Sequence, residues 1–301
     1  MRSKIILVVA ILFMATGQGF GETYFNDGGT HNIDYTLADR VQVRNGPSNM
    51  PTTVNLLNGG IISGTRLVAL EDSLINIYGG SVSRVAAADN SQVTMSNGSV
   101  GGYLSATDNA QITMSGGSAA YLQAWGNGQV TMSGGSADSF TAYDSGSHIT
   151  MSGGSVIGDL YVSGQATMSN GSVGGRLYAA GLVNLSGGSV GGNLEAFTTC
   201  LVNWSGGTLA GDIVLDSQSI LSIDGTNFAI DGSPVDFGEI TSILGGWWED
   251  EPYRLLTGTL ANGDIINNQF QIGNDAQIVL VPEPATLLLL GLGGLAIRKR
   301  K

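Results

Sequence analysis

A seven-residue motif recurs through the middle of this 301-residue chain at a nearly constant spacing. It reads VTMSGGS at residues 130–136 and ITMSGGS at residues 112–118 and 149–155. A proline-free period of 17 to 20 residues, with two short alternating segments in each copy, is too short for helical-pair repeats and predicts one coil of a parallel β-helix per copy. The period is counted between the last glycines of successive turns: Gly60, Gly80, Gly98, Gly117, Gly135, Gly154, Gly171, Gly188 and Gly207.

These nine copies predict an all-β fold. We expect a single-stranded parallel β-helix (β-solenoid), right-handed and of about nine coils, over residues 54–216, followed by a β-rich C-terminal cap. Glycine suits the bend of each coil because it adopts positive φ and carries no side chain to collide with the neighbouring coil.

Alternation assigns the side chains of the motif to the inside or the outside of the coil. Successive strand residues point to opposite sides, so Val93 and Met95 are expected inside, while Thr94 and Ser96 are expected outside. The methionine column is predicted to be core, because an unbranched side chain fills a narrow interior and stacks on its copy in the next coil. A metal-binding methionine array is the alternative. A second strand after each turn is expected to point pairs such as Leu104 and Ala106 inward.

The outward positions form two columns of hydroxyl groups, which predict a flat hydroxyl lattice. The serine column runs from Ser96 to Ser205, and the threonine column is the candidate surface-binding ladder. Two threonine columns on a solenoid resemble the ice-binding faces of some β-helical antifreeze proteins, but the second column here is serine, which lacks the methyl groups of such faces. A glycan-contacting surface and a plain solvated face are the other interpretations. The ladder consists of Thr94, Thr113, Thr131, Thr150 and Thr167.

Charge excludes one class of partner. Between residues 22 and 281 the chain has 23 acidic residues and 6 arginines, and 6 − 23 gives a formal charge of −17. Such a surface repels nucleic acid and anionic lipid, so we expect neither as a partner. Cys200 is the single cysteine, so no internal disulfide is expected.

The N-terminal residues have the form of a secretory signal peptide. Arg2 and Lys4 precede an apolar run over residues 5–14, and small residues follow, with a cleavage position after Gly21. We therefore expect residues 1–21 to be removed by signal peptidase during export. A buried first helix is the alternative.

The C-terminal residues 282–301 have the organisation of a sorting signal. A Pro-Glu-Pro motif precedes an apolar stretch over residues 285–297, which is short for the roughly twenty residues of a spanning helix. The basic tail behind it would hold this end on the cytoplasmic side. The motif is Pro282, Glu283 and Pro284, and the tail is Arg298, Lys299, Arg300 and Lys301.

These residues resemble the PEP-CTERM signal of Gram-negative bacteria, which combines Pro-Glu-Pro, a short hydrophobic transmembrane helix and a basic end. The resemblance implies recognition by an exosortase, cleavage near Pro282 to Pro284, and delivery of the folded part to the cell surface or extracellular matrix. It implies nothing about what that part binds.

Two flanking segments break the repeat. Residues 22–53 are rich in turn residues and are expected to be an N-terminal cap over the open first coil. Residues 217–281 contain short apolar runs joined by Asp-Gly and Asn-Gly turns, which predict the C-terminal cap. Trp247 and Trp248 are expected to be buried in that cap or to form an aromatic platform for a sugar ring.

The sequence offers weak support for metal or catalytic chemistry. Asp89, Asp108 and Asp144 occupy similar turns, and they predict solvated Asx turns or, as the weaker alternative, a calcium-binding edge. No other cofactor, no metal site and no catalytic residue is expected. Polysaccharide lyases and hydrolases on β-helices need carboxylates clustered with basic residues, or paired acids, at a cleft. Arg84 and Arg176 are too far apart along the stack to join in such a cluster.

These observations favour an exported, exosortase-processed, non-enzymatic structural or adhesive component of the cell surface or extracellular matrix that is associated with polysaccharide. An ice-binding protein that uses the Thr/Ser ladders is one alternative, and a β-helical polysaccharide-degrading enzyme is another. Expected partners are signal peptidase, exosortase and an extracellular polysaccharide. Membrane contact is expected only through the terminal sorting segments.

Overall fold

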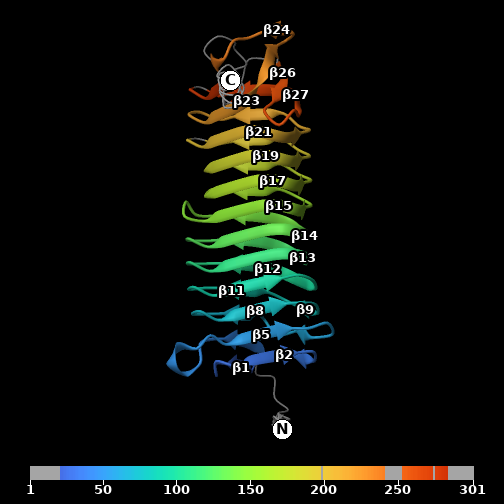
Figure 1. Cartoon of the computed structure of the whole chain (residues 1–301), viewed down its shortest axis with the longest axis vertical. Helices are drawn as coiled ribbons and strands as arrows, with labels where there is room; N and C mark the ends of the chain where they lie inside the picture. The colour runs from blue at the N-terminus through green and yellow to red at the C-terminus, as the bar shows by residue number, and fades with distance from the viewer. Residues whose placement is uncertain (1–20, 198, 241–252, 274, 284–301) are drawn as a thin grey trace, which may run out of the picture.

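The chain folds as a rod of stacked β-strand coils, with its first coils at one end and the cap at the other (Figure 1). The computed structural model describes residues 21–197, 199–240, 253–273 and 275–283. Within them the fold is all-β, a parallel β-solenoid of about 11 turns, as the repeat predicted. The one short helical turn in the described part is the 3-10 element η1 (Pro47–Asn49).

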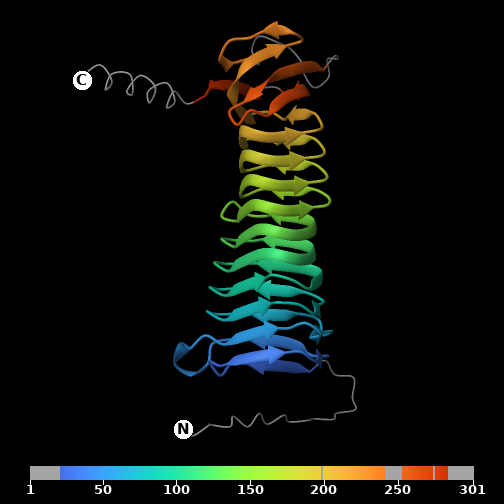
Figure 2. The same cartoon turned by 45° about the vertical axis from the view of Figure 1, so that its right-hand side comes forward.

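Each coil has three faces, although the sequence showed only two strands per coil. The extra face is a two-residue Ser-Val segment directly after the glycine bend, such as Ser81–Val82, which is too short to display alternation. Figure 2 shows how the strands of one face lie above one another along the rod.

Face 1 carries the threonine column and holds the first four residues of most long strands. Its strands are β2 (Thr30–Ile33), β5 (Thr53–Leu56), β8 (Leu74–Ile77), β11 (Gln92–Met95), the starts of β13 (Gln111–Ala124), β14 (Gln129–Ala142), β15 (His148–Val156), β17 (Gln165–Val173), β19 (Leu182–Val190), β21 (Leu201–Leu209) and β23 (Ile220–Ile230), and finally β28 (Gln277–Pro282).

Face 2 is the short face, and face 3 is the second predicted strand of each coil. Face 2 begins with β3 (Thr36–Leu37), β6 (Ile61–Ile62), β9 (Ser81–Val82) and the start of β12 (Ser99–Ala106). Face 3 contains β1 (Glu22–Phe25), β4 (Arg40–Val43), β7 (Leu67–Ala69), β10 (Val85–Ala87), the ends of β12, β13 and β14, and then β16 (Leu160–Val162), β18 (Leu177–Ala179), β20 (Leu194–Ala196), β22 (Ile213–Leu215) and β27 (Ile265–Ile272).

Equivalent residues of successive coils stack in register, which confirms the inside and outside assignments. Val93 pairs with Ile112, and Met95 pairs with Met114, which in turn pairs with Met132. All five are fully or almost fully buried, as are the Leu-Ala pairs of face 3. Burial of apolar surface, at about 25 cal/mol per Å², is the main stabilising term of such a stack.

The structure also explains why methionine always holds the same position. The terminal methyl of each methionine lies beside the bend glycine of the next coil: a Cβ built on Gly117 would lie 2.6 Å from Met95 Cε, and one built on Gly135 would lie 2.8 Å from Met114 Cε. These glycines also have φ near +79°, where a side chain is strained. Methionine and glycine therefore depend on each other across coils.

The coil count rises from nine to about 11 because both flanks join the stack. Residues 22–53, expected as a cap, include β1 and β2, which pair in parallel with β4 and β5 of the next coil. This first coil lacks the Met-Ser-Gly-Gly sequence, so its period is not visible.

The C-terminal flank combines stacked strands with an antiparallel excursion. β26 (Arg254–Leu260) pairs antiparallel with both β23 and β27, while β27 and β28 return to the stack beside β22 and β23. Two short strands, β24 (Ser233–Pro234) and β25 (Gly238–Glu239), complete this region. Trp247 and Trp248 lie outside the described residues.

Candidate binding faces and sorting motif

The threonine ladder is a continuous column on face 1. Thr94 pairs with Thr113, and the register continues through Thr131 and Thr150 to Thr167. The first two side chains are exposed and the other three are half-buried. The geometry needed for a surface-binding ladder is present over five coils, and its ligand stays a prediction.

Asparagine ladders continue the column at both ends. Asn76 Nδ2 donates to Asn55 Oδ1 at 2.9 Å, and Asn203 Nδ2 donates to Asn184 Oδ1 at 2.8 Å. These amides use each other as partners along the stack, so the unbroken hydroxyl column is that of the five threonine coils.

The serine column does not extend that surface as a flat lattice. The register shifts after the methionine, so that Ser115 pairs with Gly134 and Ser186 pairs with Gly206. The hydroxyl of Ser205 donates to the carbonyl of Leu185 in the preceding coil at 3.3 Å. These serines therefore stand at a bulged corner, where the hydroxyl satisfies backbone groups.

The sorting motif follows the folded body directly. β28 pairs with β23 as far as Pro282, which lies opposite Gly225, and Glu283 follows as an exposed residue. Pro284 and the basic tail Arg298–Lys301 lie outside the described residues, as does the expected hydrophobic helix. Among the described residues, none belongs to a helix with the length and apolar character needed to cross a membrane.

Two of the three aspartates considered for calcium accept hydrogen bonds from backbone amides of the preceding coil. Asp89 and Asp108 have φ of 58° and 55°. Asp89 Oδ2 accepts the Glu71 amide at 2.9 Å, and Asp144 Oδ2 accepts the Gly126 amide at 2.6 Å. The described part of the chain contains no group of three or more His, Cys, Asp or Glu side chains placed to hold a metal ion.

Face 3 contains a groove of about 440 Å³ near the N-terminal end of the rod, formed by the outward side chains of β4, β7, β10, β12 and β13. Its lining includes three arginines and two aromatic rings, with no carboxylate and no histidine. The groove exists because the side chains in the middle of the face, such as Ala86 and Ser105, are small. The lining residues are Arg40, Gln42, Arg44, Arg66, Val68, Leu70, Ala86, Ala88, Tyr103, Ser105, Thr107, Gln123 and Trp125.

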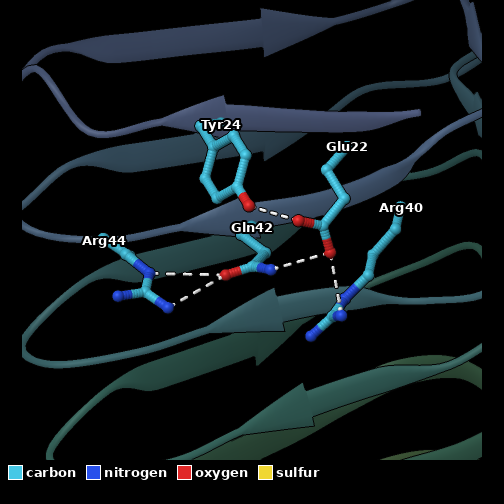
Figure 3. A network of polar contacts seen from close by, with 5 residues as sticks. All are labelled: Glu22, Tyr24, Arg40, Gln42 and Arg44. Atoms are coloured by element: carbon cyan, nitrogen blue, oxygen red, sulfur yellow. Dashed lines mark hydrogen bonds and ion pairs between the residues drawn. The ribbon is translucent and has the colours of Figure 1, made fainter.

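A polar network fixes the end of this groove at the first coils (Figure 3). Glu22 accepts hydrogen bonds from Tyr24 and Gln42, and its Oε1 lies 2.8 Å from Arg40 Nη1. The Tyr24 hydroxyl is the largest cause of the lowered pKa of Glu22, and the same bond raises the pKa of Tyr24. Arg44 donates to Gln42 Oε1 at 3.1 Å, so it is held by a neutral partner.

A column of arginines followed by tyrosines runs along one edge of the groove, and three of its members, Arg40, Arg66 and Tyr103, line the groove. Val41 pairs with Leu67, Leu67 with Val85, and Val85 with Leu104. The residue that precedes each of these four therefore lies above its counterpart in the neighbouring coil. That column, read along the stack, is Arg40, Arg66, Arg84, Tyr103 and Tyr121.

Aromatic rings form the rest of the upper wall. The Arg84 guanidinium carbon lies 5.3 Å from the centroid of the Tyr103 ring, a cation–π contact. Trp125 stacks on Tyr143 with centroids 3.6 Å apart, and Trp125 remains 38% exposed. The wall therefore offers flat, accessible rings held in fixed orientation.

This groove was not predicted from the sequence, although one signal was available. Four of the six arginines between residues 22 and 281 lie within residues 40–84 of a strongly acidic chain. Their common face depends on the register of the first coils, where the period is irregular.

Comparison with known proteins identifies the C-terminal segment. The PEP-CTERM protein-sorting motif matches residues 280–301. No curated protein and no solved structure matches the chain. The motif and the fold together define the class: an exported, exosortase-sorted protein with a parallel β-solenoid body, directed to the cell surface or extracellular space.

Proposed function

We propose that this protein is a non-enzymatic structural or adhesive component of the cell surface or extracellular matrix, associated with polysaccharide. The observation that carries the proposal is the direct junction between the rod and the sorting motif, since β28 stays paired through Pro282. A stack in which each coil contacts its neighbours is an extended scaffold with long faces, a shape suited to polymer contact.

The composition of the face 3 groove supports binding without hydrolysis. Glycoside hydrolysis requires a pair of carboxyl groups beside the scissile bond, and the groove lining contains none. The enzyme alternative predicts shortening of a polysaccharide on incubation with the protein. Under our proposal polysaccharide length stays constant.

Fractionation of native cells tests the proposed location. We expect the protein in the surface or matrix fraction, with a C-terminus near residues 282–284 by intact mass. A variant with Arg298–Lys301 replaced by glutamines keeps the folded body but should accumulate as an uncleaved precursor. Wild-type protein that stays in the inner membrane at full mass would contradict the proposal.

Ice binding is the second candidate, because the threonine column is in register over five coils. It predicts thermal hysteresis that disappears in Thr131→Tyr, whose ring would interrupt the column. Our proposal predicts no hysteresis in either protein.

A further inference from the structure

We propose that the groove on face 3 is a binding site for an acidic polysaccharide, a glycan whose rings carry carboxylate groups. This inference deepens the proposed function and rests on it for the biological setting. The binding site itself is argued from charge, shape and side-chain chemistry.

Charge is the first argument. The lining has three arginines and no acidic residue, within a body whose arginines and carboxylates sum to −17. Among the described residues, Arg40 has a carboxylate partner, Glu22, while Arg44 donates to the amide oxygen of Gln42. Arg66 lines the groove without any ion pair to a described carboxylate. The groove is therefore a local anion site on a protein that elsewhere repels anions.

The stacking of the arginines is the second argument. Arg40, Arg66 and Arg84 hold one position in three successive coils, which a β-sheet places about 4.8 Å apart. The first two line the groove, and Arg84 lies beside it against Tyr103. Like charges directly opposite each other in a sheet are destabilising. A ligand that carries repeated negative charge reduces the repulsion within such a row of guanidinium groups. Carboxylate suits this role because arginine pairs with it through two parallel hydrogen bonds.

Shape and side chains favour a glycan as the polyanion. A groove of about 440 Å³ lies in the size range of ligand sites. Tyr103 and Trp125 offer ring faces against which the apolar face of a sugar can lie, and Ser105, Thr107 and Gln123 offer polar groups for its hydroxyls.

The overall charge argues against nucleic acid as the occupant. Double-stranded DNA carries a charge about every 1.7 Å along its axis and extends well beyond one groove. Beyond the arginine coils it would meet the acidic surface. A single strand stacked on Tyr103 and Trp125 is the closest rival, and the test includes it.

Titration calorimetry on the purified full chain in detergent micelles tests the site, independently of where the protein resides in the cell. The probes are polygalacturonate, neutral dextran and oligo-dT. We expect polygalacturonate to bind, with affinity that falls as salt rises, and dextran and oligo-dT to bind at least tenfold more weakly. Arg66→Gln should weaken polygalacturonate binding about ten- to a hundredfold, because a charged hydrogen-bonded pair is lost.

Arg176→Gln is the matched control. Arg176 precedes β18 at the equivalent position of face 3, but it lies outside the groove and pairs with Glu195 at 3.0 Å. The affinity of Arg176→Gln for polygalacturonate should stay within twofold of wild type. Arg66→Lys, which keeps the charge and loses the planar fork, should bind with intermediate affinity. Circular dichroism confirms that the variants keep their β-structure.

Several results would overturn the inference: no binding of polygalacturonate, equal binding of dextran, tighter binding of oligo-dT, or equal losses in Arg66→Gln and Arg176→Gln. Polygalacturonate binding by a protein found in the wrong compartment would refute the proposed function alone. Surface location without binding would refute this inference alone.

Discussion

Replacing Gly135 with alanine should destabilise the solenoid through two separate effects. Gly135 has φ of +79°, and left-handed backbone costs an L-residue about 1–2 kcal/mol. In addition, its new Cβ would lie 2.7 Å from the Gly117 carbonyl oxygen and 2.8 Å from Met114 Cε. Overpacking of this kind costs about 1–3 kcal/mol, so the expected total is about 2–5 kcal/mol.

Gly263→Ala separates the two effects. Gly263 has φ of +93°, but a Cβ there meets nothing within 4 Å. This variant should lose only the backbone part, about 1–2 kcal/mol. The difference between the two variants, about 1–3 kcal/mol, measures the stacking of one coil on the next.

Urea unfolding of the processed protein, followed by circular dichroism, is the assay. The midpoint should fall further in Gly135→Ala than in Gly263→Ala while the slope stays unchanged. In the double variant Gly135→Ala/Met114→Ala, the truncated methionine leaves space for the new Cβ. The loss of unfolding free energy should therefore be smaller than the sum of the two single losses by about 0.5–3 kcal/mol. Equal losses in the two glycine variants, or strict additivity with Met114→Ala, would refute the methionine–glycine packing.

Three further predictions test other parts of the structure. Phe140→Ala should cost about 3–5 kcal/mol in the same urea assay because Phe140 is fully buried, while Tyr121→Ala, at a side chain 53% exposed, should change stability by under about 0.5 kcal/mol. Burial raises the pKa of the Cys200 thiol from 9.0 to about 11, so at pH 8 alkylation of the native protein should be about a hundredfold slower than in urea; equal rates would contradict the burial. The Leu255 amide and Arg254 lower the pKa of Asp231. The ionised Asp231 carboxylate therefore stabilises the fold above its ordinary pKa, and this contribution is lost as pH falls through the lowered pKa. On acidification below about pH 4, the melting temperature of Asp231→Asn should fall less than that of wild type.

The repeat predicted the core correctly because it specifies packing residue by residue. A strand alternates with period two, so placing Val93 and Met95 inside also places Thr94 and Ser96 outside. The same register then holds in every coil with a recognisable motif, as the pairing of Met114 with Met132 confirms. Inward columns are thus readable from one aligned set of repeats.

The third face and the groove could not be read in that way. The Ser-Val segment of face 2 is too short to reveal a period. The arginine column is hidden because Arg40 and Arg66 are 26 residues apart, with η1 inserted between them, while Arg66 and Arg84 are 18 apart. Only the pairing of Val41 with Leu67 aligns them. Irregular spacing conceals a surface site even when the core around it is regular.

That contrast has a physical cause that bears on where function lies in a solenoid. Inward positions must repeat, because each methionine packs beside the glycine of the next coil and a change on one side strains the other. Outward positions carry no such constraint, and identical outward residues can only build a uniform stripe, such as the threonine ladder. A groove requires unlike neighbours: arginines in two coils, alanines in the next, and aromatic rings in the two that follow. The face 3 site therefore draws its specificity from outward residues that change from coil to coil.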